Sequence, residues 1–267
     1  MISRVCTVLL ATWFGAVALA EEVKLAVTTS FENSGLADVL LPEIKAETGL
    51  DVLMLVVGTG QALRLGEAGD VDAILVHSRK AEEAFVNAGF GTHRREIMYN
   101  DFVLIGPEGD PAQISEAETA TDALRRIAAA TPPFVSRGDD SGTHKKELAL
   151  WASADVAPEG DWYRAVGSGM GAALNTAAGL DAYIMADRAS WLNFGNKAGL
   201  ALLFSGDPVL FNQYAFLPVN PERHSHVNNA AALALENWLT GERAKELIGG
   251  YEINGEKLFT FNAQPEG

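Results

Sequence analysis

The most informative stretch of this chain is Ser136-Arg137-Gly138-Asp139-Asp140-Ser141-Gly142-Thr143-His144, which follows an apolar Pro133-Phe134-Val135. A strand that ends in a glycine-containing, hydroxyl-rich turn and continues into a helix leaves the first backbone N–H groups of that helix unpaired. Such a turn is suited to hold an anion. Arg137 can close its planar guanidinium over an oxyanion, and the hydroxyls of Ser141 and Thr143 add donors without adding charge. The same residues also fit an ordinary capped helix, with Arg137 paired to a neighbouring aspartate.

Two earlier strands end in turns of the same kind. Val23–Thr28 is an apolar strand that runs into Thr28-Thr29-Ser30, and Asp51–Val57 is a second one, followed by Gly58-Thr59-Gly60. A third strand–helix pair begins at Val71–His77. Strands that alternate with helices at this spacing indicate βαβ units and a parallel sheet, in which ligands bind beyond the carboxyl ends of the strands. We therefore expect the first two helix N-termini to face one crevice.

Two long extended segments suggest that the chain crosses between two lobes. They are Met98–Gly106 and Val209–Val219. We expect residues 21–99 and 213–267 to form one lobe and residues 100–212 to form the other. The fold class predicted in this way is α/β, with mostly parallel sheets flanked by helices and a ligand cleft between the lobes.

The amino end predicts export. The chain has 267 residues, enough for one large or two medium α/β domains, and Cys6 is its one cysteine. Residues 1–20 have the pattern of a signal peptide, with a positive Arg4, an apolar run and Ala18-Leu19-Ala20 before a cleavage site after Ala20. Cys6 lies inside this segment, so the mature protein is expected to carry no lipid. We expect a periplasmic protein that is not itself embedded in the membrane.

The net charge limits the partners. The formal charge is −15, and removal of Arg4 with the signal peptide makes it one unit more negative. Nucleic acid and anionic membrane surfaces are not expected as partners, because both require a basic patch. An anionic ligand is compatible with this charge if it is recognised at short range in a closed cleft, since exposed charges beyond about 8 Å are largely screened.

Five segments, in this order, together resemble the tungstate-binding periplasmic proteins of tungstate ABC importers. They are Val27 to Ser30, Val57 to Leu63, Met98 to Val103, Ser136 to His144 and Gly167 to Gly171. The resemblance extends from about Val23 to about Leu192. It implies a two-lobed type II periplasmic binding protein fold that holds an oxyanion between its lobes and delivers it to a membrane permease powered by a separate ATPase. Tungstate is the expected ligand, and molybdate or another oxyanion is the alternative.

The resemblance also implies which residues bind the ligand. The corresponding positions are Thr28, Thr29, Ser30, Gly58, Thr59, Gly60, Arg137, Ser141, Gly142 and Thr143. The residues expected to support them are Asp139, Asp140, His144, Ser168 and Gly169. The two aspartates are expected to cap the helix or orient Arg137, because a carboxylate beside a dianion is repulsive. Val27 stands where the family often has a threonine, and Ser168 stands where a glutamine is common.

Catalysis, cofactors and metals are not expected. The glycine turn at Gly58 lacks the third glycine of a dinucleotide fingerprint and the lysine of a phosphate-binding loop. His224 and His226 have no cysteine or third histidine nearby, which is poor evidence for zinc. A hypothesis of a different class is a secreted hydrolase that uses Ser141 or Ser168, and it requires a histidine within hydrogen-bond reach. A third hypothesis keeps the binding fold without an importer. We predict a monomeric binding protein that is not an enzyme.

Overall fold

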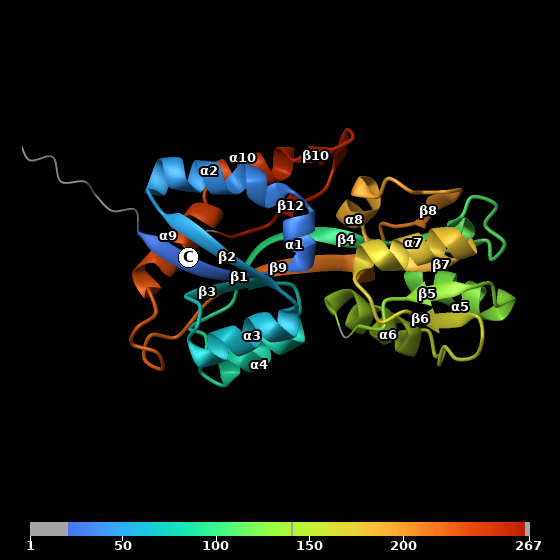
Figure 1. The fold of residues 1–267 in the computed structure, drawn as a ribbon, viewed down its shortest axis with the longest axis horizontal. Helices are drawn as coiled ribbons and strands as arrows, with labels where there is room; N and C mark the ends of the chain where they lie inside the picture. Colours follow the sequence, from blue (N-terminus) through green and yellow to red (C-terminus); the bar gives the residue numbers. More distant parts are fainter. Residues whose placement is uncertain (1–20, 140, 265–267) are drawn as a thin grey trace, which may run out of the picture.

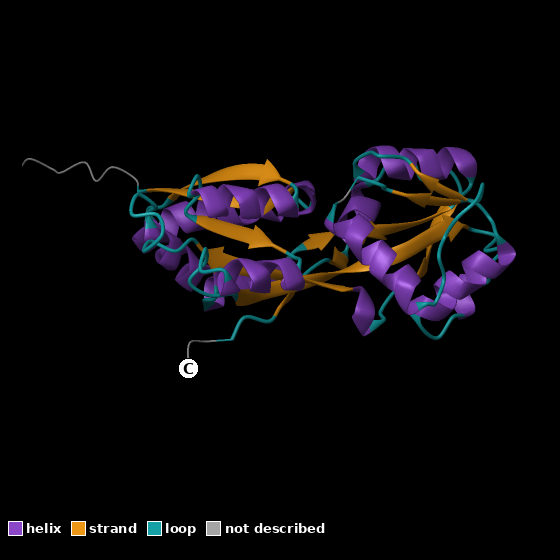
Figure 2. Cartoon of the chain, turned by 90° about the horizontal axis from the view of Figure 1, so that it is seen from below, coloured by secondary structure: helices purple, strands orange, loops and turns teal. Residues whose placement is uncertain are grey.

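The computed structural model describes residues 21–139 and 141–264. The predicted signal peptide and Asp140 therefore lie outside the described residues. Figure 1 shows two groups of helices and strands joined by the long strands β4 (Arg95–Pro107) and β9 (Phe211–Pro218). Figure 2 shows the same two groups from below, with helices on the outside of the strands in each. The strand order through both groups is β2-β1-β3-β9-β4-β7-β5-β6.

The first group is built around β1 (Glu22–Thr28), which pairs in parallel with β2 (Asp51–Val57) and β3 (Ala73–Val76). In the register of the first pair, Thr28 lies opposite Val57, so the two strands end side by side. The helices of this group are α1 (Thr29–Asn33), α2 (Leu36–Thr48), α3 (Thr59–Ala68), α4 (Arg79–Asn87), α9 (Asn229–Leu239) and α10 (Glu242–Gly250). The parallel βαβ arrangement predicted for this part of the chain is confirmed.

The second group is built around β5 (Phe134–Ser136), which pairs in parallel with β6 (Tyr163–Ala165) and β7 (Tyr183–Asp187). The strand β8 (Leu200–Phe204) pairs with β4. The helices of this group are α5 (Ala120–Ala130), α6 (Gly142–Ser153), α7 (Met170–Leu180) and α8 (Arg188–Asn193), with 3-10 turns η1 (Ile114–Glu116) and η2 (Pro208–Leu210). The remaining short strands are β10 (Glu252–Ile253), β11 (Glu256–Lys257) and β12 (Thr260–Phe261).

The crossing strands divide their pairing between the two groups. The first half of β4, up to Asp101, pairs with β9, and its second half, from Phe102, pairs with β7 and β8. At the change-over, the side-chain Nδ2 of the buried Asn212 donates to the side-chain Oδ1 of Asn100 over 2.9 Å. The chain therefore passes between the groups close to residues 100 and 212.

The helix α2 illustrates how sequence spacing sets the packing. Leu36, Leu40 and Ile44 recur at helical spacing and are all at most 2% exposed. Gly49 ends the helix in a left-handed conformation with φ 76°, which a residue with a side chain adopts at a cost. Packing this one face against the sheet leaves the helix start, and with it the end of β1, at the edge that faces the second group.

Candidate functional site

Ser30 lies at the centre of a hydroxyl cluster at the end of β1. Thr28 caps α1, because its Oγ1 accepts the backbone N–H of Phe31 over 3.3 Å. The Ser30 Oγ lies 2.9 Å from the Thr28 Oγ1, 3.0 Å from the His77 Nε2 and 3.3 Å from the Tyr214 hydroxyl. Three neighbours thus fix the position of the Ser30 hydroxyl, which is partly exposed, unlike that of the buried Thr28.

His77 follows β3 directly and enters this cluster uncharged at neutral pH. Burial, with a further contribution from the charge of Arg137, lowers the pKa of His77 to about 4. Its ring also packs against the ring of Tyr214, with centroids 4.9 Å apart. The imidazole therefore supports Ser30 through a neutral hydrogen bond and supplies no positive charge to a ligand at neutral pH.

The second group contributes Arg137, which follows β5. The residue is 9% exposed, and one of its terminal guanidinium nitrogens forms an ion pair with Asp139. The Oδ1 atom of Asp139 also accepts the backbone N–H of Ser141 over 3.2 Å. Although burial opposes it, these hydrogen bonds and the charge of Arg137 hold the pKa of Asp139 below its usual range. Asp139 thus contacts both the Arg137 side chain and the backbone of Ser141.

Residues of both groups line a pocket of about 340 Å³, which we call the inner pocket. Its volume lies at the small end of the range of about 300–1,000 Å³ for ligand sites. It is lined by Thr29, Ser30, Asn33, Val56, Arg137, Gly169, Met170, Gly171, Ala172, Asp187 and Ser190. The predicted residues Thr29 and Ser30 therefore share a cavity with the predicted residues Arg137 and Gly169, although more than 100 positions separate them in the sequence.

Two of the predicted residues carry buried donors without a partner in the described part of the chain. They are the Nε of Arg137 and the Oγ1 of Thr59. Buried polar groups are almost always hydrogen-bonded, so each unpaired group requires a specific explanation. Both can donate a hydrogen bond, and Arg137 lines the inner pocket whereas Thr59 does not.

Gly142, the first residue of α6, lies in contact with the first group. A Cβ atom added there would lie 2.8 Å from the His77 Cε1 and 3.7 Å from the Thr59 Oγ1. The absence of a side chain at this position therefore permits α6 to approach β3 and the start of α3. This contact brings the second predicted glycine turn of the first group against the turn that follows Arg137.

The other predicted residues of the second group take positions around Arg137. Ser141 caps α6, since its Oγ accepts the backbone N–H of His144 over 3.2 Å. Thr143 is buried and His144 partly exposed on the same helix. The backbone N–H of Ser168 donates to the carbonyl of Arg137 over 3.2 Å. Asp140 is outside the described residues.

The predicted glycines of the first group lie nearer to the surface. Gly58 precedes α3 as its exposed N-cap, and Gly60 is partly exposed in its first turn. Neither lines the inner pocket, which Thr29 and Ser30 reach from the neighbouring strand end.

The sequence analysis missed His77, Tyr214 and Asp187. Asp187 ends β7, is 1% exposed and lines the inner pocket. Its Oδ1 caps α8 by accepting the backbone N–H of Ser190 over 2.8 Å. Burial raises the pKa of Asp187, and the nearby charge of Arg137 acts against this rise. A signal was present for two of the three, because His77 and Asp187 stand at the ends of strands that feed the same edge of the sheet.

The described residues contain neither a metal-binding cluster nor a membrane-spanning helix. Within residues 21–139 and 141–264, no three or more His, Cys, Asp or Glu side chains are grouped so that they could hold a metal ion. The same residues contain no helix that is both long and apolar enough to span a membrane.

Two α/β lobes with a small polar pocket between them define a solute-binding protein of the two-lobed class. The chain belongs to the periplasmic binding protein (PBP) superfamily, because the model of the PBP superfamily domain matches residues 16–243. This membership confirms the family resemblance and the fold class predicted from the sequence.

Three similar proteins are named for tungstate. The chain is 48% identical over 244 residues to the tungstate-binding protein TupA of Peptoclostridium acidaminophilum, covering 90% of this chain and 85% of that protein. The solved structure of TupA from Desulfovibrio alaskensis G20 superposes with a TM-score of 0.85 at 43% identity, covering 92% of this chain and all of that one. That of the tungstate ABC transporter from Geobacter sulfurreducens gives 0.80 at 47% identity, covering 86% and 99%.

Proposed function

We propose that this protein captures a tetrahedral oxyanion outside the cytoplasm, with tungstate as the ligand, and delivers it to the permease of an ABC importer. The observation that carries the proposal is the inner pocket, where the Ser30 hydroxyl cluster of one lobe shares a small cavity with the buried Arg137 of the other. Two relatives that cover most of this chain are named as tungstate-binding proteins. These relatives support a binding protein rather than an enzyme.

The chemistry of this pocket suits a small dianion. Hydrogen bonds from charged or oriented donors to an anion are shorter and stronger than neutral ones. Arg137 lines the pocket and supplies a planar cation whose Nε has no partner among the described residues. Closure of the lobes would exclude water that competes for these donors. The ligand-binding set of the proposal is Thr28, Thr29, Ser30, Gly58, Thr59, Gly60, Arg137, Ser141, Gly142 and Thr143.

The proposal includes four finer points. The signal peptide is cleaved after Ala20, and the mature protein works in the periplasm as a monomer. Residues 21–99 and 213–267 form one lobe, and residues 100–212 form the other. The change of strand partners in β4 after Asp101 and the contact of Asn212 with Asn100 support these boundaries.

Two alternatives lead to different measurements. Molybdate has nearly the same shape and charge as tungstate, so selectivity is a difference between two similar affinities. The hydrolase hypothesis loses support at Ser141, whose hydroxyl accepts a backbone N–H as a helix cap. A serine–histidine contact exists instead at Ser30 and His77, so assays with ester and phosphoester substrates should include Ser30→Ala. We expect no turnover by either protein.

Calorimetric titration tests the proposal. Ligand-free protein is titrated with tungstate, molybdate, sulfate and phosphate under the same buffer and salt conditions. We expect tight binding of tungstate with one ion per chain and weaker binding of sulfate and phosphate. Tight binding of molybdate alone would change the assigned ligand, whereas no measurable binding of any of the four anions would refute the proposal.

A further inference from the structure

Asp187 is an acid in a pocket that is proposed to hold a dianion. It stands at the end of β7 and lines the inner pocket. The residue is 1% exposed, so water does little to screen a charge on its carboxylate. A negative charge at this position repels a dianion in the same small cavity. Binding of the dianion therefore favours neutralisation of Asp187, by a cation or by a proton.

The nearby cations of the described chain are paired with other acids. Arg137 lines the same pocket, and its ion pair is with Asp139. Arg188 follows Asp187 directly in the sequence, and it pairs with Asp101 of β4 over 2.6 Å. The charge of Arg137 acts on Asp187 from a distance, and within the described residues Asp187 has no ion pair of its own.

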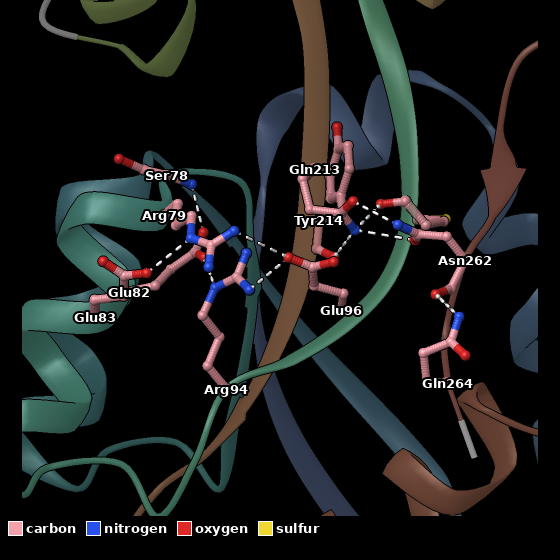
Figure 3. A network of polar contacts seen from close by, with 11 residues as sticks. Ser78, Arg79, Glu82, Glu83, Arg94, Glu96, Gln213, Tyr214, Asn262 and Gln264 are labelled. Carbon is pink, nitrogen blue, oxygen red and sulfur yellow. Dashed lines mark hydrogen bonds and ion pairs between the residues drawn. The ribbon is translucent and has the colours of Figure 1, made fainter. Parts of the chain in front are cut away.

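The contacts of Asp187 differ from those of Glu82, a fully buried acid of the first lobe. Arg94 donates to the Oε2 of Glu82 over 2.7 Å, as Figure 3 shows. The Oδ1 of Asp187 instead accepts the backbone N–H of Ser190 over 2.8 Å, and the Ser190 hydroxyl and the backbone of Asp187 itself add further hydrogen bonds. These donors are all neutral. Since a carboxylate has about four lone-pair sites, one remains for a proton.

The surroundings of Asp187 favour its protonated form. Burial raises the pKa of Asp187, whereas the Ser190 hydrogen bonds and the charge of Arg137 act in the opposite direction. Burial also raises the pKa of Tyr214 on β9, and the charge of Asp187 adds to this rise, so the two groups are close enough to interact. The helix α7, which packs against β7, carries no titratable side chain.

Two further groups near the cleft can change their charge, and the test must separate them from Asp187. His77 contacts Ser30 of the inner pocket, and burial lowers its pKa to about 4. Glu147 is the buried titratable residue of α6, which also packs against β7, and burial raises its pKa to about 7. Its carboxylate accepts the Tyr163 hydroxyl over 2.7 Å and does not line the inner pocket.

We propose that Asp187 is a ligand-binding residue that holds a proton in the anion complex and donates a hydrogen bond from it to an oxygen of the dianion. This inference rests on the proposed function and adds an acid to the proposed ligand-binding set. The proton comes from solvent and converts a repelling carboxylate into a neutral donor. Because the bound dianion favours the protonated form, tungstate affinity is highest below the pKa of free Asp187 and falls as the pH rises above it.

Calorimetric titration of tungstate in buffers of different protonation enthalpy counts the protons, because the heat varies with that enthalpy in proportion to the protons taken up. Asp187→Asn and Asp187→Ser keep a helix-capping side chain but cannot take up the proton. His77→Gln removes the imidazole. The matched control is Asp72→Asn, since Asp72 is a buried acid that accepts the backbone N–H groups of Lys24 and Asn228 at the opposite end of β3 from His77. Thermal unfolding of each ligand-free variant verifies that it is folded.

The expected result is a proton that depends on Asp187. In titrations from about pH 6.5 to about pH 9, where tungstate itself carries no proton, wild type takes up about one proton per tungstate above the pKa of free Asp187. Its affinity falls about tenfold per pH unit over that range. Asp187→Asn and Asp187→Ser take up no proton, and their affinities stay within about twofold across the range. His77→Gln and Asp72→Asn keep the wild-type uptake, and Glu147 is present in all of these proteins.

Several results would overturn the inference. They are uptake that persists in both Asp187 variants, uptake that is lost in His77→Gln or Asp72→Asn, and loss of tungstate binding by both folded Asp187 variants, which would mean that the ionised carboxylate is required. Absence of tungstate binding by the wild type would overturn the proposed function as well. Tight binding by the wild type without proton uptake at any pH of the series would overturn this inference alone.

Discussion

Replacement of Arg137 by alanine tests the assigned ligand site most directly. Arg137 is buried, its Nε has no partner among the described residues, and one of its terminal nitrogens is paired with Asp139. The change removes at least one hydrogen bond to a charged ligand, which contributes about 1.5–3 kcal/mol. It also leaves the carboxylates of Asp139 and Asp187 beside the dianion without their nearby cation, so we expect the upper end of this range. About 3 kcal/mol corresponds to an affinity roughly 100-fold weaker.

The assay is calorimetric titration of tungstate into wild type, Arg137→Ala and Arg137→Lys. Lysine keeps the charge but not the planar fork, so an intermediate loss of about tenfold is expected. Arg94→Gln is the matched control, because the side chain of Arg94 is 12% exposed, against 10% for Arg137, and it pairs with Glu82 away from the inner pocket. Thermal unfolding of each ligand-free variant separates a loss of affinity from a loss of folding.

Two results would refute the assignment of Arg137 to the ligand site. If Arg137→Ala binds tungstate as tightly as wild type while remaining folded, the guanidinium does not contact the anion and the inner pocket is wrongly assigned. If Arg94→Gln weakens binding as much as Arg137→Ala, the effect reflects general disturbance of the fold.

Two further predictions concern the contact between the lobes. Gly142→Ala places a Cβ 2.8 Å from the His77 Cε1, an overlap that costs about 1–3 kcal/mol in the closed form, so tungstate affinity falls about tenfold, whereas Gly179→Ala, whose Cβ meets nothing within 4 Å, leaves it unchanged. Because the pKa of His77 is lowered to about 4, the unfolded chain takes up this proton first, and up to about 3 kcal/mol of stability present above pH 6.5 is lost as the pH falls toward 4. Denaturant unfolding at several pH values should show this loss in wild type and not in His77→Gln, and parallel curves would contradict it. Burial raises the pKa of Glu147 to about 7, so the protein loses stability from this group as the pH rises from 4.5 to 7. Wild type and His77→Gln both contain Glu147, so this loss cancels when the two are compared.

Ligands bind beyond the carboxyl ends of parallel strands, and this rule led to Thr29 and Ser30, which line the inner pocket. The same rule also applies to His77 and Asp187, which the sequence analysis did not predict. It selected Thr28 to Ser30 because hydroxyls and a helix start follow β1 there. His77 after β3 and Asp187 at the end of β7 meet the same geometric condition, but neither belongs to a hydroxyl- or glycine-rich turn. The prediction therefore depended on the residue types in each turn, although the position of a residue at a strand end was itself a sufficient signal.

Other features could not be read from local sequence. Tyr214 lies inside β9 and reaches Ser30 across 184 positions of sequence, so no periodic pattern signals the contact. The first helical segment is divided in two, since Thr28 caps the short α1 and α2 starts only at Leu36. The strand β6 is three residues long, which is too short to show alternation.

The acidity of the chain and its proposed anionic ligand are compatible because the acids near the site are already engaged. Asp139 is bound to Arg137 and to the backbone of Ser141, and Asp187 accepts the backbone N–H of Ser190 in a buried position that raises its pKa. A carboxylate whose lone pairs accept local donors holds those donors and the arginine in place before the ligand arrives, and preorganisation lowers the cost of binding. The same carboxylates repel the dianion, and the positive charge of Arg137 offsets this repulsion. The one guanidinium that lines the inner pocket thus decides whether its acids support binding or oppose it.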